Sequence, residues 1–174
     1  MTGWPVTFVA GTIPTAANLN TLSMPPDCQA YVSGTVNVAT FSSAYTLVPL
    51  ASESYDYSTA MHDNSTNNSR VYARGSGKYE GQAVATFVGS NTTGYRHLLV
   101  YKNNAGDTSL ATGVQIASLP LAPIANTQSV LLSFETFLTD GYYLEMYVRQ
   151  SSGGSQTLAT GAANTSLTLR GVSG

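Results

Sequence analysis

The chain has 174 residues and a formal net charge of -2, with only 9% charged residues against 43% apolar ones. This length suits one domain with its own core, and the apolar share excludes a charge-rich disordered chain. With so few lysines and arginines, the chain lacks the basic surface that binds a row of phosphates, so we expect no nucleic-acid binding. Because no apolar run is long enough for a membrane span and no basic leader opens the sequence, we expect synthesis in a cytoplasm and no membrane insertion.

The first 26 residues differ in composition from the rest, because prolines are concentrated there. Within them, the stretch 15–22 has a capping residue and helix formers, which predicts a short helix that needs a partner surface. We therefore interpret residues 1–26 as an attachment arm and residues 27–174 as the folded domain. The apolar side chains of the arm that we expect to bind a partner are Trp4, Phe8, Val9, Ile13, Leu19 and Leu22.

From about Gln29 onward, apolar residues recur with period two in short runs separated by polar clusters, which predicts strands joined by turns. The expected strands, in chain order, lie around 30–32, 35–40, 46–50, 70–73, 79–88, 95–102, 108–117, 129–138, 142–150 and 166–172. The loop from Gly89 to Gly94 is rich in turn-forming residues, so we expect the two strands that flank it to form a hairpin.

About eight to ten antiparallel strands without intervening helices must each bury an apolar face, which predicts an all-β, two-sheet jelly-roll sandwich. In the strand 142–150, one stripe holds Leu144, Met146 and Val148. The opposite stripe carries Tyr143 and Tyr147, which we expect to lie exposed, and exposed aromatic side chains favour coverage by another subunit. The alternative is that these two tyrosines line the second face of a central strand.

Several short motifs resemble one known family. They are Tyr55-Asp56-Tyr57, Met61-His62-Asp63, the stretches 66–70 and 93–103, and Gly77-Lys78-Tyr79. These motifs resemble the C1q/TNF-like domains of bacteriophage virion proteins. The stretch from Phe8 to Asn20 looks like the opening shared by phage tail-associated and fibre proteins. Together the two resemblances span residues 8–20 and 29–172.

The resemblance implies a jelly roll that assembles as a threefold homotrimer on the virion surface, as a capsid decoration protein or a minor tail protein. It also implies that the domain has no catalytic residues and no cofactor. A closed cyclic interface suits a nearly uncharged chain, because apolar and hydroxyl side chains pack there without unpaired charges. We expect this interface to include Tyr143, Tyr147, His97 and Tyr101, and the arm to bind phage capsid or tail proteins.

A receptor-binding module is the alternative function. Loop tyrosines can stack on sugar rings, so the alternative predicts contacts between host cell-surface glycans and Tyr55, Tyr57 and Tyr95.

Other candidate sites are weaker. His62, Asp56 and Asp63 lie in one polar stretch that could supply cation ligands, but the spacing of a calcium loop is absent, so we expect no metal site. A serine nucleophile elbow is absent and His97 lies in the middle of a strand, so we expect no enzyme. The lone Cys28 excludes an internal disulfide and is interpreted as a small buried side chain.

Overall fold

The computed structural model describes residues 25–40, 45–57, 60–104, 112–124 and 126–172. They form twelve β-strands, and none of these residues is helical, so no helix long and apolar enough to cross a membrane occurs in this part of the chain. The strands are β1 (Asp27–Tyr31), β2 (Val36–Val38), β3 (Thr46–Leu47), β4 (Ser52–Asp56), β5 (Arg70–Tyr72), β6 (Gly77–Val88), β7 (Arg96–Asn103), β8 (Val114–Leu121), β9 (Gln128–Leu138), β10 (Tyr143–Gln150), β11 (Gln156–Leu158) and β12 (Ser166–Val172).

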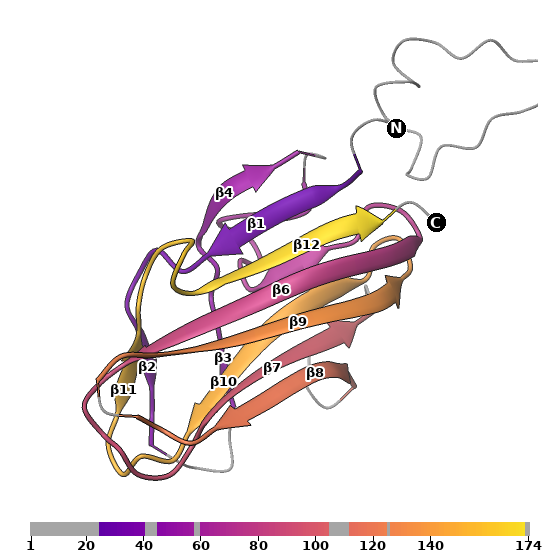
Figure 1. Cartoon of the computed structure of the whole chain (residues 1–174). Helices are drawn as coiled ribbons and strands as arrows, with labels where there is room; N and C mark the ends of the chain where they lie inside the picture. Colours follow the sequence, from indigo (N-terminus) through magenta and orange to yellow (C-terminus); the bar gives the residue numbers. More distant parts are fainter. Residues whose placement is uncertain (1–24, 41–44, 58–59, 105–111, 125, 173–174) are drawn as a thin grey trace, which may run out of the picture.

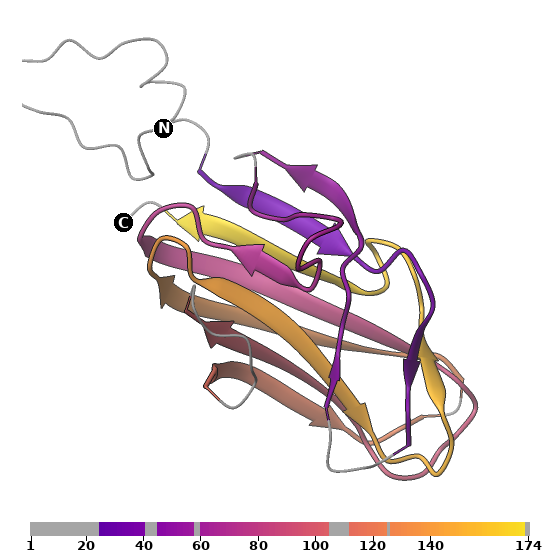
Figure 2. The same ribbon diagram turned by 180° about the vertical axis from the view of Figure 1, so that it is seen from behind.

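The strands form two antiparallel sheets that pack face to face. Sheet A has seven strands in the order β2-β11-β6-β12-β1-β4, with β9 on the other side of β6. Sheet B has five strands in the order β3-β10-β7-β8, with β5 also paired to β10. Figure 1 shows β1, β12, β6 and β9 of sheet A side by side, and Figure 2 shows the same molecule from behind. The predicted all-β sandwich is confirmed.

The core lies between the sheets and follows the period-two pattern of the long strands. On β6, Tyr79, Ala83 and Phe87 are fully buried, and most of their neighbours along the strand are exposed. The stripe predicted on β10 is confirmed, because Leu144, Met146 and Val148 join the same cluster. Burial of each large apolar side chain contributes about 1.5 to 3 kcal/mol, so this alternation is a main source of stability.

The predicted hairpin between residues 79–88 and 95–102 is wrong. The two segments form β6 and β7, which lie in different sheets. Strand β6 pairs with β9 along one side and with β12 and β11 along the other, so it has no edge left for β7. The loop from Gly89 to Gly94 therefore crosses between the sheets, because turn-forming residues reverse a chain without fixing which strands pair.

Two strands were not predicted, and one was misplaced. Strand β4 has a polar sequence, and β11 has only three residues beside a glycine-rich turn, so neither shows a clear period-two pattern. Strand β8 begins at Val114 and continues to Leu121, later than expected, while residues 108–111 lie outside the described part of the chain. Within β8, Pro120 is tolerated because this is an edge strand that pairs only with β7.

The first strand begins at Asp27, next to the boundary predicted between arm and domain. Residues 1–24 lie outside the described part of the chain, so the arm and its six apolar contact residues stay a prediction. The six are Trp4, Phe8, Val9, Ile13, Leu19 and Leu22.

Candidate functional site

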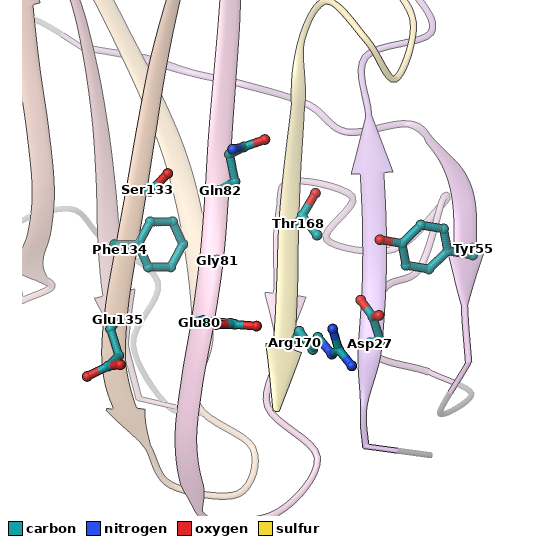
Figure 3. A pocket seen from close by; sticks show the side chains of 10 residues that line it. All are labelled: Asp27, Tyr55, Glu80, Gly81, Gln82, Ser133, Phe134, Glu135, Thr168 and Arg170. Carbon is teal, nitrogen blue, oxygen red and sulfur yellow. The ribbon is translucent and has the colours of Figure 1, made fainter. Parts of the chain in front are cut away.

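The outer face of sheet A is hollowed by a groove of about 640 Å³. Figure 3 shows side chains of β4, β1, β12, β6 and β9 around it. The lining residues are Asp27, Tyr55, Glu80, Gly81, Gln82, Ser133, Phe134, Glu135, Thr168 and Arg170. Apart from Phe134 and Tyr55, the side chains that line the groove are polar, so it suits hydrogen bonds and ion pairs more than a deeply buried apolar ligand.

Gly81 leaves space for an aromatic ring beside the groove. A Cβ atom at this position would lie 2.4 Å from Cζ of Phe134 and 2.7 Å from the backbone oxygen of Thr168. Because residue 81 carries no side chain, the Phe134 ring of the neighbouring strand β9 occupies that space. The sequence between Tyr79 and Phe87 alternates regularly, and the glycine at its centre is the residue that a period-two argument does not explain.

Charged residues of both signs line up across four strands of the groove. In the register of the sheet, Asp27 on β1 lies opposite Arg170 on β12, which lies opposite Glu80 on β6. Glu80 in turn lies opposite Glu135 on β9, whose carboxylate pairs with exposed Lys78 at 2.8 Å. Burial raises the pKa of Asp27, while Arg170 and a hydrogen bond from Tyr55 oppose that shift.

Two large apolar side chains project from the same outer face beside the groove. Leu131 and Phe137, both on β9, are 51% and 64% exposed. Ser133 and Glu135 lie between them on this face, so the edge strand presents a mixed apolar and polar row to the outside. Exposed apolar side chains next to a groove are typical of surfaces that another molecule covers.

The outer face of sheet B is organised around one buried carboxylate, Glu145 on β10. It accepts hydrogen bonds from Nε of Arg70 at 3.0 Å and from the hydroxyl of Tyr147 at 2.8 Å. The side chains of Asn103 and Ser69 complete its coordination at 3.3 Å and 3.4 Å. Burial, followed by the hydrogen bond to Glu145, raises the pKa of the Tyr147 phenol, which therefore stays a donor near neutral pH.

The expectation that Tyr143 and Tyr147 lie exposed is wrong within the single chain. Tyr143 is 0% exposed and Tyr147 only 6% exposed. The guanidinium of Arg70 lies 4.3 Å from the ring centroid of Tyr143, and the Tyr72 ring packs 5.5 Å away. Strand β5, which pairs with β10, supplies both of these covering side chains, so the alternative that the two tyrosines line the second face of a central strand is confirmed.

The other two residues predicted at an interface, His97 and Tyr101, lie half-buried on this same face. The Tyr101 ring packs edge-on against Tyr147 at 5.5 Å. Nε2 of His97 lies 2.7 Å from Oγ of Ser118 on β8. Burial lowers the pKa of His97, and the nearby positive charge of Arg149 lowers it further, so the imidazole is neutral at pH 7.

Arg149 forms the centre of a cluster at one end of sheet B. Its guanidinium carbon lies 5.2 Å from the ring centroid of Tyr45 and 5.1 Å from that of Tyr95. His97 is its direct cross-strand neighbour on β7, and the His97 ring meets Tyr95 edge-on at 6.2 Å. We call Tyr45, Tyr95, His97, Ser118 and Arg149 the Arg149 cluster. Sequence reasoning named Tyr95 and His97 but missed the arginine that joins them, because its partners are distant in sequence.

The three tyrosines predicted to contact glycans do not form one site. Tyr55 and Tyr57 stack at the end of β4 with ring centroids 5.0 Å apart, and Tyr57 is 65% exposed. Tyr95 directly precedes β7 of sheet B. The predicted set is thus divided between the two sheets.

The polar stretch around His62 is occupied by internal contacts. Nδ1 of His62 lies 3.0 Å from Glu53, and Asp56 accepts backbone hydrogen bonds from Met61 and His62. Asp63 caps its own turn through hydrogen bonds from residues 65 and 66, which lower its pKa to about 2. Within the described residues, no three His, Cys, Asp or Glu side chains are placed to hold a metal ion.

No protein-family model and no curated protein matches the sequence. Solved structures do match the fold. The structure of Eiger TNF from S. frugiperda superposes with a TM-score of 0.60 at 13% identity, covering 86% of this chain and 94% of that one. Murine APRIL at pH 5.0 superposes with a TM-score of 0.64 at 10% identity, covering 85% of this chain and 99% of that one. The chain therefore has a TNF-like jelly-roll fold, as expected, and at these identities the likeness concerns the fold alone.

Proposed function

We propose that this TNF-like jelly roll is a non-enzymatic module that associates with two further copies of itself through the outer face of sheet A. The observation that carries the proposal is the exposure of Leu131 and Phe137, 51% and 64%, beside the groove. Covering apolar surface stabilises an assembly by about 25 cal/mol per Å². On the outer face of sheet B, the two central tyrosines are already buried, so their rings offer no such surface.

The charges on this face also suit a cyclic interface. Arg170 lies between Asp27 and Glu80 in the sheet, and Lys78 pairs with Glu135. A second copy, rotated about the symmetry axis, can place its acidic side chains against the basic side chains of the first copy. Such pairing keeps the interface free of unpaired ions. The threefold symmetry itself is proposed from the resemblance to C1q/TNF-like domains.

Sedimentation equilibrium tests this proposal. The full chain should sediment with the mass of three copies, and the double variant L131S/F137S should sediment as a single chain. The matched control is V114S on β8 of sheet B, where Val114 is 58% exposed, and it should keep the mass of three copies. A monomeric wild-type chain, or dissociation by V114S alone, would refute the proposal.

We propose in addition that the assembly is displayed on a bacteriophage particle and held there by residues 1–26. The support is the resemblance of residues 8–20 to openings of phage tail-associated and fibre proteins. Deleting residues 1–22 should abolish co-purification with particles and leave a folded, self-associated domain. A truncated chain that still co-purifies with particles would contradict this attachment, whether the wild-type position is the capsid or the tail.

Recognition of host-surface glycans is the second candidate function. It is favoured by half-buried rings and polar groups that share the outer face of sheet B, such as Tyr101, whose hydroxyl donates to Gln115 at 3.3 Å. Such surfaces can pack against the apolar face of a sugar ring and bind its hydroxyl groups. Binding of the full chain to an oligosaccharide array tests this function, and an array without any bound saccharide would exclude it.

A further inference from the structure

The Arg149 cluster holds the positively charged guanidinium group of Arg149 in a fixed position on a partly exposed surface. The guanidinium carbon of Arg149 has aromatic rings at 5.2 Å and 5.1 Å, contributed by Tyr45 before β3 and Tyr95 before β7. An exposed arginine ordinarily loses much side-chain freedom when it binds a ligand. Here the two rings already restrict the side chain, so less entropy is lost on binding.

The charge balance of this face favours an anionic ligand. Among the described residues on the outer face of sheet B, one side chain carries a carboxylate, that of Glu145. This carboxylate is buried and pairs with Arg70 at 3.0 Å. The strands of sheet B carry no other carboxylate that would repel an incoming anion. A guanidinium presents its N–H donors in a planar fork that matches the two oxygens of a carboxylate.

Neutral hydrogen-bonding groups surround the cation. His97 lies opposite Arg149 across the β7–β10 pair, and its Nε2 atom is 2.7 Å from the hydroxyl of exposed Ser118. Gln115, also exposed, lies three residues earlier on β8. Half-buried rings beside imidazole, hydroxyl and amide groups match a pyranose, which has apolar faces and hydroxyl edges, better than they match the apolar anchor residues of a protein partner.

We infer that the Arg149 cluster binds a saccharide that carries a carboxylate. Arg149 pairs with the carboxylate, the rings of Tyr45 and Tyr95 pack against the sugar, and His97 and Ser118 bind its hydroxyl groups. The inference rests on the second candidate function, glycan recognition, and names its ligand class and its site. It is independent of self-association, because the cluster and the groove lie on opposite sheets.

The experiment uses the full chain and three acidic oligosaccharides: a hyaluronan tetrasaccharide, a tetragalacturonate and sialyllactose. Each is compared by titration calorimetry with its carboxyl-reduced form, which keeps the sugar skeleton and loses the charge. We expect at least one acidic form to bind and its reduced form to bind about ten to a hundred times more weakly. Equal binding of the acidic and the reduced forms would overturn the inference.

Variants locate the site. R149Q should weaken binding of the acidic form about ten- to a hundred-fold, and R149K should weaken it less, because lysine keeps the charge but loses the planar fork. The control K102Q removes one positive charge from an exposed side chain outside the cluster and should bind like the wild type. Thermal melting and sedimentation of each variant confirm that fold and mass are unchanged. Because R149K keeps the charge, it still tests the site if R149Q fails to fold.

The outcomes separate this inference from the function on which it rests. If no saccharide of either kind binds, glycan recognition and the acidic site both fail. If saccharides bind but R149Q binds as tightly as the wild type, only the Arg149 site fails. Loss of binding in Y57A with retention in R149Q would place the glycan site at the stacked Tyr55–Tyr57 pair instead.

Discussion

Replacing Gly81 by alanine tests the packing of the Phe134 ring over β6 beside the groove. The new Cβ atom would lie 2.4 Å from the Phe134 ring and 2.7 Å from the Thr168 backbone oxygen, so the ring and the strand must both shift. Overpacking of this kind costs about 1 to 3 kcal/mol. The lower backbone entropy of an unfolded alanine offsets about 0.5 to 1 kcal/mol of that. We therefore expect G81A to lower the free energy of unfolding by about 1 to 2 kcal/mol.

Urea unfolding at one fixed protomer concentration measures this change, because the proposed self-association would make stability depend on concentration. The same substitution in an F134A background should cost about 1 kcal/mol less, since the ring that opposes the new methyl group is gone while Thr168 remains. The reasoning is refuted if G81A is as stable as the wild type, or if its effect is the same in both backgrounds.

Two further predictions concern buried polar groups. E145Q leaves Arg70 without its counterion in a site where the two side chains are 4% and 14% exposed, so urea unfolding should show a loss of about 3 kcal/mol. The control K78Q breaks an ion pair that is 50% and 60% exposed and should cost less than about 1 kcal/mol, and equal losses would contradict the argument. Tyr79 is fully buried, its hydroxyl donates to the Gly75 carbonyl at 2.9 Å, and burial raises its pKa to about 12. The folded chain thus holds this proton more tightly than the unfolded chain. The contribution of Tyr79 to the free energy of unfolding is therefore fully present below pH 10 and declines from about pH 10 to 12. Urea unfolding at a series of pH values should show the stability advantage of wild type over Y79F shrinking across that interval, and a constant advantage would refute the assignment.

Sequence patterns predicted the strands well where apolar and polar residues alternate along the chain and one face of the strand is buried in the core. In β9, Val130, Leu132 and Leu138 fall on the buried face as expected, because period two follows directly from strand geometry. The pairing of strands was not predictable in the same way. The loop from Gly89 to Gly94 has the composition of a hairpin turn, yet β6 pairs with β9 over eleven positions and leaves β7 to the other sheet.

The candidate sites depended on contacts between residues far apart in sequence. Tyr147 reads as an outward-facing aromatic residue, but its ring is covered and its hydroxyl is bound to Glu145. Arg149 reads as an ordinary surface charge, and its two flanking rings lie at positions 45 and 95. A period-two pattern assigns a side chain to one side of a strand and carries no information about which loop or neighbouring strand covers that side.

The sequence by itself determined that this protein is an all-β sandwich, which residues of its long strands are buried, and that its few charges are spread thinly. These properties are local, because they follow from residue propensities and from the alternation of side chains along a strand. Only the tertiary structure decided that β6 and β7 separate, that the groove lies on sheet A and that Arg149 sits between two rings. Those features join residues that are tens of positions apart in the sequence. The contacts that stabilise them form only once the strands have paired and the two sheets have packed together.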